Sequence, residues 1–445
     1  MYKEALHTIK LSIPIVIGEL IQMAITIIGI GMVGKLSYLH LAAASLINSI
    51  VNVFFIIGVG ISLSILQQVA SNNGAKKYSV ISHYLFNGII LLTILSFSFS
   101  ISIYFGAPYL HLLGLNEELI QIGIPYLQIM GWALIPLLVS LSLRHFFDGL
   151  GKTQTTLIFS ILTLPINIFF NWVFVFGNFG FAKLGLNGIG VAYFVSNMII
   201  IAAMLSVIGL GKYFHQFTLQ HKYTWKLNLK TIKSLYQIGI PISIQLGIEI
   251  LAFAISGLLI GKENIIHQAA YQITFSCMII ILMMNLALAQ GNSIRVSKAW
   301  GEKDYKKIDK ITKSSIFISI IFSSFCTVIM LIFSFKIPFI FNSNINVVND
   351  AASLLIFASL FQFINSLQII ISSTLRAIKD VKYSTLYTLI AFWLIGLPIE
   401  YGLLKLGLGV KSIWIGFSIG LAYTVILFYK RFIKIIYTKV SLKLP

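Results

Sequence analysis

The sequence predicts an all-α membrane protein with twelve transmembrane helices, arranged as two six-helix lobes that a parallel internal repeat relates. Three observations predict this fold: apolar stretches of bilayer length recur along the chain, basic residues segregate to alternate loops, and the two halves of the sequence align. Composition agrees, because only 10% of the residues are charged and 58% are hydrophobic. A soluble domain carries about 25% charged residues.

A helix needs about 20 apolar residues to cross the ~30 Å hydrocarbon core of a bilayer. Stretches of this kind occupy residues 12–34, 44–70, 84–105, 121–143, 154–177, 187–210, 237–261, 268–294, 314–335, 350–374, 383–404 and 412–429. The first continues past the length of a signal-peptide apolar region, so we expect it to remain as a membrane helix.

Basic residues test the number of spans, because lysine and arginine accumulate in cytoplasmic loops. Twelve spans place both termini on one side and leave six of the 32 basic residues on the other: Lys35, Lys183, Lys262, Lys336, Lys405 and Lys411. A missed or added span would destroy this segregation. The sequence therefore predicts a multi-pass protein of the inner (cytoplasmic) membrane with both termini in the cytoplasm.

The two halves of the chain share a register. A shift of 227 residues pairs Pro14 with Pro241 and His40 with His267, and a shift of 232 pairs Arg144 with Arg376. Each repeat contains an even number of spans, so both copies enter the membrane from the same side, as in parallel repeats about the membrane normal. We expect an N-terminal lobe of residues 1–210, a cytoplasmic connector of 211–236 and a C-terminal lobe of 237–445. Such lobes are typical of a transporter that rocks.

Three of the 13 acidic residues lie within predicted spans: Glu19, Glu249 and Glu400. Glu249 follows the start of its span by about twelve residues, which is roughly 18 Å of helix and close to the bilayer centre. A charged carboxylate there costs about 2.5–3.5 kcal/mol on insertion scales. Glu249 is therefore predicted to bind and release a cation. The alternative is a neutral glutamate that hydrogen-bonds a neighbouring helix.

Other polar residues of the second half lie at a similar depth. Gln245 is one helical turn before Glu249, and Asn285 and Asn365 each lie about ten residues from the cytoplasmic end of their spans. These side chains are candidates to converge with Glu249 on one site. Glu400 is near the outer end of its span, where a solvated and a functional glutamate are equally compatible with the sequence.

Five stretches together resemble the multidrug and toxic compound extrusion (MATE) family, over nearly the whole chain. They are LSIPIVIGELIQMAITIIGIGMVG (11–34), LRHFFDGLGKTQTT (143–156), LPINIFFNWVFVFGNFG (164–180), GIPISIQLGIE (239–249) and LQIIISSTLRAIKD (367–380). The resemblance implies twelve helices in two lobes that open alternately. It also implies export of organic cations and other amphipathic compounds, driven by inward flow of H+ or Na+.

The resemblance assigns cation coupling to the Glu249 position. In the Na+-driven branch the Asn365 position is commonly an aspartate and the Phe361 position a tyrosine, and this sequence departs at both. A hard cation requires several oxygen ligands, so the missing carboxylate favours H+ over Na+.

In one branch of the family, an ion site in the first half uses an aspartate on the first helix and another on the fifth. This chain has Gly29 and Asn171 at those positions, while Asn167 fits. Glu19, Gln22, Asn167 and Asn171 are therefore expected either to line the substrate path or to join helices. Phe361 and Met283 are further candidates for the substrate path.

The leading hypothesis is a secondary antiporter exporting amphipathic, cationic drugs or metabolites by rocking alternating access. A flippase for lipid-linked precursors is the alternative, followed by a membrane-embedded enzyme, for which no HExxH, GxGD or HxxxxD pattern is present. The GLGKT of 149–153 lacks the first glycine of a phosphate loop, so we expect no ATP binding.

The expected partners are the substrate and the lipid bilayer. We expect a monomer without nucleic acid, cofactor or metal, and Cys277 and Cys326 serving only in packing.

Overall fold

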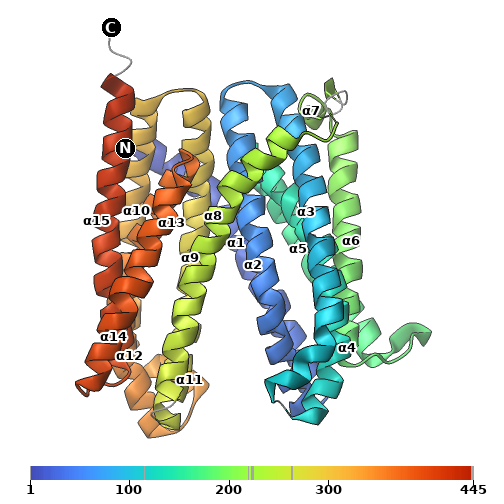
Figure 1. The fold of residues 1–445 in the computed structure, drawn as a ribbon, viewed down its shortest axis with the longest axis vertical. Helices are drawn as coiled ribbons and strands as arrows, with labels where there is room; N and C mark the ends of the chain where they lie inside the picture. The colour runs from blue at the N-terminus through green and yellow to red at the C-terminus, as the bar shows by residue number, and fades with distance from the viewer. Residues whose placement is uncertain (1, 115, 219, 222–224, 262–263, 442–445) are drawn as a thin grey trace. The chain divides into compact units, whose positions relative to one another are not determined.

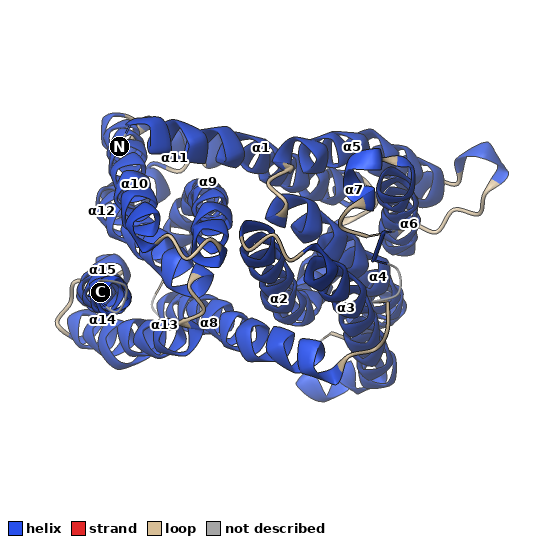
Figure 2. Ribbon diagram, turned by 90° about the horizontal axis from the view of Figure 1, so that it is seen from above, coloured by secondary structure: helices blue, strands red, loops and turns tan. Residues whose placement is uncertain are grey.

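The computed structural model describes residues 2–114, 116–218, 220–221, 225–261 and 264–441. Lys262, one of the six basic residues predicted outside the cytoplasm, lies outside the described residues. Twelve helical segments in the described ranges are long and apolar enough to cross a membrane, which confirms the predicted number of spans. The described part of the chain consists of helices and loops without strands (Figure 2).

The chain divides into two compact units, and the boundary cuts two helices. The N-terminal unit is Ile17–Ser243 and the C-terminal unit is Met1–Val16 with Ile244–Pro445. The lobe and connector boundaries expected from the sequence stay predictions. The short helix α7 (Lys212–His215) and the first turns of α8 (Leu229–Gly261) fall within the segment predicted as the connector.

The N-terminal unit is organised around α4, which packs against α2, α3 and α6. Its main helices are drawn from blue to green in Figure 1. They are α1 (Tyr2–Gly34), α2 (Tyr38–Gly74), α3 (Tyr78–Gly106), α4 (Glu117–Gly149), α5 (Thr153–Phe176) and α6 (Leu186–Leu210). Close approach depends on small residues. Gly188 of α6, for example, lies where a Cβ would meet the Phe174 backbone at 2.6 Å.

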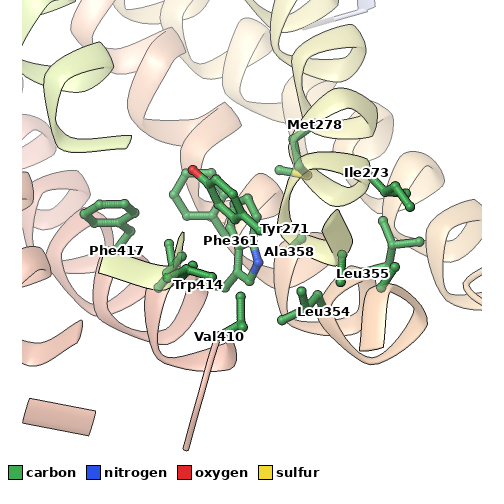
Figure 3. Close-up of a cluster of buried hydrophobic side chains, with 14 of the residues drawn as sticks. Tyr271, Ile273, Met278, Leu354, Leu355, Ala358, Phe361, Val410, Trp414 and Phe417 are labelled. Atoms are coloured by element: carbon green, nitrogen blue, oxygen red, sulfur yellow. The ribbon is translucent and has the colours of Figure 1, made fainter. Parts of the chain in front are cut away.

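The C-terminal unit is organised around α12, which packs against α9, α10 and α15. Its other elements follow α8 in the colours from yellow-green to red in Figure 1. They are α9 (Ile265–Gly301), α10 (Tyr305–Ile332), α11 (Lys336–Phe341), α12 (Ile345–Ala377), α13 (Val381–Leu389), the π-helical segment η4 (Ile390–Gly396), α14 (Leu397–Lys405) and α15 (Lys411–Ser441). Its apolar core is aromatic around Tyr271, Phe361, Trp414 and Phe417 (Figure 3).

Side-chain bonds fix the first turns of α1 and α8. In the C-terminal unit, Arg295 of α9 forms an ion pair with Glu4 and donates to the Thr8 hydroxyl at 2.8 Å. In the N-terminal unit, Gln68 of α2 donates to Ser234 of α8 at 2.9 Å. Gln68 and Arg295 are 227 residues apart, so the internal repeat places equivalent positions in equivalent roles.

The helices differ from the predicted spans in two respects. Several extend beyond the apolar stretch, and α15 continues to Ser441, because hydropathy marks the lipid-facing length whereas a helix continues into water wherever its backbone bonds are made. The eleventh span is divided by the π-helical segment Ile390–Gly396, which periodicity did not predict.

Candidate functional site

Gln245 is the centre of a buried polar network that joins three elements of the C-terminal unit. Its Nε2 donates to Ser372 of α12 at 2.9 Å. Its Oε1 accepts from Ser384 of α13 at 3.3 Å and from the Arg376 guanidinium at 3.4 Å. The Ser372 and Ser384 hydroxyls also lie 2.8 Å apart. The amide of Gln245 is therefore satisfied at both ends, as a buried polar group requires.

Glu249 lies one turn further along α8, beside Gln245 and Gln368, and within the field of the Arg376 guanidinium. It is only partly buried, whereas Gln245 is 1% exposed. Polar side chains therefore lie on one side of Glu249, and part of the residue remains exposed.

Asn365, Gln368, Ser372 and Arg376 recur every three or four residues along α12 and share one face of that helix. The amide atoms of Gln368 are buried and form no ordinary hydrogen bond with the described residues. Asn365 is 7% exposed. This face of α12 therefore offers polar atoms that can still form hydrogen bonds close to Glu249.

The remaining predicted residues of the second half occupy different environments. Asn285 of α9 is 1% exposed, and its Nδ2 has no partner in the described part of the chain. Phe361 lies inside the aromatic core, 5.3 Å from the Trp414 ring (Figure 3). Met283 is partly buried on α9. The roles predicted for these residues stay predictions.

In the N-terminal unit, Asn171 donates to Asn167 at 2.7 Å, and both side chains are 1% exposed. The Oδ1 of Asn171 has no partner among the described residues. Glu19 and Gln22 of α1 are partly buried. The structure thus brings Asn167 and Asn171 together in a cluster that contains no carboxylate of its own.

Glu400 is not solvated. Although it is near the end of its span, its side chain is 0% exposed, and its Oε2 accepts from the Ser256 hydroxyl at 2.6 Å. Of the two alternatives that the sequence left open, the solvated one is therefore wrong.

Sequence reasoning did not assign Arg376, Gln368 or Ser384 to the site. In the sequence, Arg376 stands out only as the repeat match of Arg144. The three-to-four-residue spacing that connects it to Asn365 was the available signal. Ser384 carried no such signal, because its neighbourhood with Gln245 arises from packing between α8 and α13.

In the described part of the chain, no group of three or more His, Cys, Asp or Glu side chains is placed to hold a metal ion. Around Glu249 the groups at hand are one carboxylate, amides, hydroxyls and one guanidinium.

A sequence model of the MatE family matches residues 14–173 and 241–402. The chain belongs to the MATE family. The two matches begin 227 residues apart, in agreement with the predicted repeat. MATE proteins are membrane transporters, so this chain is a transporter rather than an enzyme.

Related MATE sequences and structures span nearly the full chain. "Probable multidrug resistance protein NorM" of Mannheimia succiniciproducens is 28% identical over 97% of this chain and 94% of its own. A protein of the same description from Bacillus thuringiensis subsp. konkukian is 31% identical over 92% and 91%.

Among solved structures, a Vibrio cholerae MATE transporter superposes with a TM-score of 0.90, at 17% identity, over 98% of both chains. The eukaryotic MATE transporter AtDTX14 gives a TM-score of 0.86, at 19% identity, over 97% of this chain and 96% of that one. These structures confirm the MATE fold.

We predict that Gln245→Ala destabilises the protein, because it removes the acceptor of Arg376 and Ser384 and the donor to Ser372. Leaving buried polar groups unpaired costs about 1–3 kcal/mol, which for a chain of this length corresponds to a fall of roughly 1–3 °C in the apparent melting temperature. Thermal unfolding in detergent measures it, with the exposed Gln272→Ala on α9 as control. Equal melting temperatures for the two variants would contradict the network.

Proposed function

We propose that this transporter is a secondary antiporter that exports amphipathic, cationic drugs or metabolites, driven by inward flow of H+ through Glu249. The site would open alternately to the two sides of the membrane. The observation that carries the proposal is a partly accessible carboxylate in the middle of a membrane span, surrounded by amides, hydroxyls and one guanidinium.

The choice of H+ over Na+ rests on the groups beside Glu249. A hard metal cation needs several oxygen ligands and gains from additional negative charge. The nearest charged neighbour of Glu249 is the cation Arg376, and the Asn365 position supplies an amide. A proton needs only the carboxylate, and Arg376 stabilises the charged form after the proton leaves.

The substrate class rests on charge and on the relatives. Two acidic residues of the predicted spans are partly exposed, Glu19 and Glu249, and their charge favours a cationic substrate. The related NorM proteins are described as multidrug resistance proteins, which supports drug-like compounds as the substrates of this chain.

We expect Glu249→Gln to abolish export driven by an inward pH gradient, because glutamine keeps the shape of the side chain but cannot release a proton. Glu249→Asp should retain partial export with a changed pH dependence, since its carboxylate is one methylene shorter. Efflux from energised vesicles measures both variants. The surface variant Glu302→Gln, which affects an ion pair with Lys307, is the control and should transport normally. Wild-type export by the Gln variant would make Glu249 structural.

We further propose that both termini and the connector lie in the cytoplasm. In a variant without Cys277 and Cys326, single cysteines would replace Lys226, Lys439, Lys183 or Lys336, which are all exposed in the structure. A membrane-impermeant maleimide added to intact cells should label positions 183 and 336 and should spare 226 and 439. Labelling of 226 together with 183 would refute this orientation.

A further inference from the structure

Glu400 of α14 is the second carboxylate enclosed by the C-terminal unit. It is 0% exposed, and its Oε2 lies 2.6 Å from the hydroxyl of Ser256 on α8. Its Oε1 is buried without a hydrogen-bond partner among the described residues. A buried carboxyl group with one of its two oxygens unpaired is costly, so its presence calls for an explanation.

The backbone around Glu400 is closely packed. Gly416 of α15 lies where a Cβ would be 2.9 Å from the Glu400 backbone nitrogen, so α15 touches the main chain of α14. Two residues earlier, Trp414 is fully buried, and its Nε1 has no acceptor in the described part of the chain. The aromatic cluster of Figure 3 includes Trp414 and Phe417.

Few polar groups act on Glu400. Tyr271 of α9 is the titratable group that faces it, and the Tyr271 hydroxyl donates to the Phe253 carbonyl at 3.2 Å. On its own helix, Lys405 points to the Tyr401 ring, 5.6 Å from the ring centroid. Within the described residues, Ser256 is the only side chain that hydrogen-bonds the carboxyl group.

Ser256 can serve both protonation states of Glu400. Its hydroxyl lies 2.6 Å from Oε2 and 3.1 Å from the Ala252 carbonyl. When Glu400 is protonated, its O–H donates a hydrogen bond to the Ser256 hydroxyl, and the Ser256 hydroxyl donates one to the Ala252 carbonyl. When Glu400 is ionised, Ser256 turns and donates to the carboxylate. A proton can therefore be bound or released without rearranging the backbone.

We propose that Glu400 is a second proton-binding site of this transporter, separate from Glu249, so that the C-terminal unit carries up to two protons per cycle. This inference rests on the proposed proton coupling. A metal cation fits poorly, because Ser256 is the only side chain of the described residues that places an oxygen within hydrogen-bond distance of the carboxyl group, whereas a hard cation takes six or more oxygens.

The two glutamates are mechanically connected. Trp393 of η4 donates its indole N–H to the Ile248 carbonyl at 3.2 Å, next to Glu249. Glu400 meets Ser256 seven residues after Trp393 on one segment and eight residues after Ile248 on the other. The segment from η4 to α14 is thus attached to α8 at two points about 10 Å apart. A change at the Glu400 contact alters how α14 holds the helix that carries Glu249.

Infrared difference spectroscopy between acidic and alkaline pH tests the site directly, through the carbonyl stretch of protonated carboxyl groups. In the Glu249→Gln protein we expect a titrating band that disappears when Glu400→Gln is added. Ser256→Ala should shift this band and Ser256→Thr, which keeps the hydroxyl, should not. Identical difference spectra for the single and double variants would overturn the proposal and make Glu400 a permanently neutral structural residue.

Transport stoichiometry gives the second readout. The opposing substrate gradient that just stops export under a fixed pH gradient reports the number of protons per substrate. Glu400→Gln should still export but should lower that number by one. An unchanged balance point would overturn the proposal. Failure of proton coupling at Glu249 would instead appear as normal export by Glu249→Gln, an outcome that leaves the Glu400 band to be measured independently.

Discussion

The structure of the C-terminal unit depends on one constraint: a polar group inside a membrane span must find its partners within the protein, because lipid offers none. Gln245 meets the constraint with Ser372, Ser384 and Arg376, and these bonds attach α8 to α12 and α13. Side-chain hydrogen bonds of this kind act between membrane helices where the hydrophobic effect does not. The network that holds α8 in place is also the wall of the Glu249 site.

The two glutamates of this unit satisfy the same constraint differently. Glu249 keeps an accessible side and has a guanidinium and two amides nearby, so its charge can be balanced by an ion, a substrate or Arg376. Glu400 is fully buried, and among the described residues only the Ser256 hydroxyl hydrogen-bonds its carboxyl group. The difference suits an exchange site for Glu249 and a proton-only site for Glu400. The π-helical segment lies between the bonds that attach the eleventh span to α8.

Hydropathy, loop charge and the internal register were enough to predict the spans and the repeat, because lipid imposes length and charge rules that act locally on the sequence. The family followed from the resemblance of five sequence stretches. The depth of Glu249 followed from the same rules. The network around it did not, since the proximity of Ser384 to Gln245 depends on how α8 and α13 pack. The environment of Glu400 could not be predicted for a related reason: distance along a span gives depth in the membrane, whereas burial depends on how the other helices pack around the residue. The π-helical segment has no periodic pattern that hydropathy detects.

The central claim is proton coupling at the Glu249 site, and transport by the purified protein in liposomes tests it most directly. Export of a fluorescent organic cation would be followed under an inward H+ gradient without Na+, and separately under an inward Na+ gradient with equal pH on both sides. We predict export with the H+ gradient alone and none with the Na+ gradient alone. Export driven by Na+ at equal pH, or by neither gradient, would contradict the account.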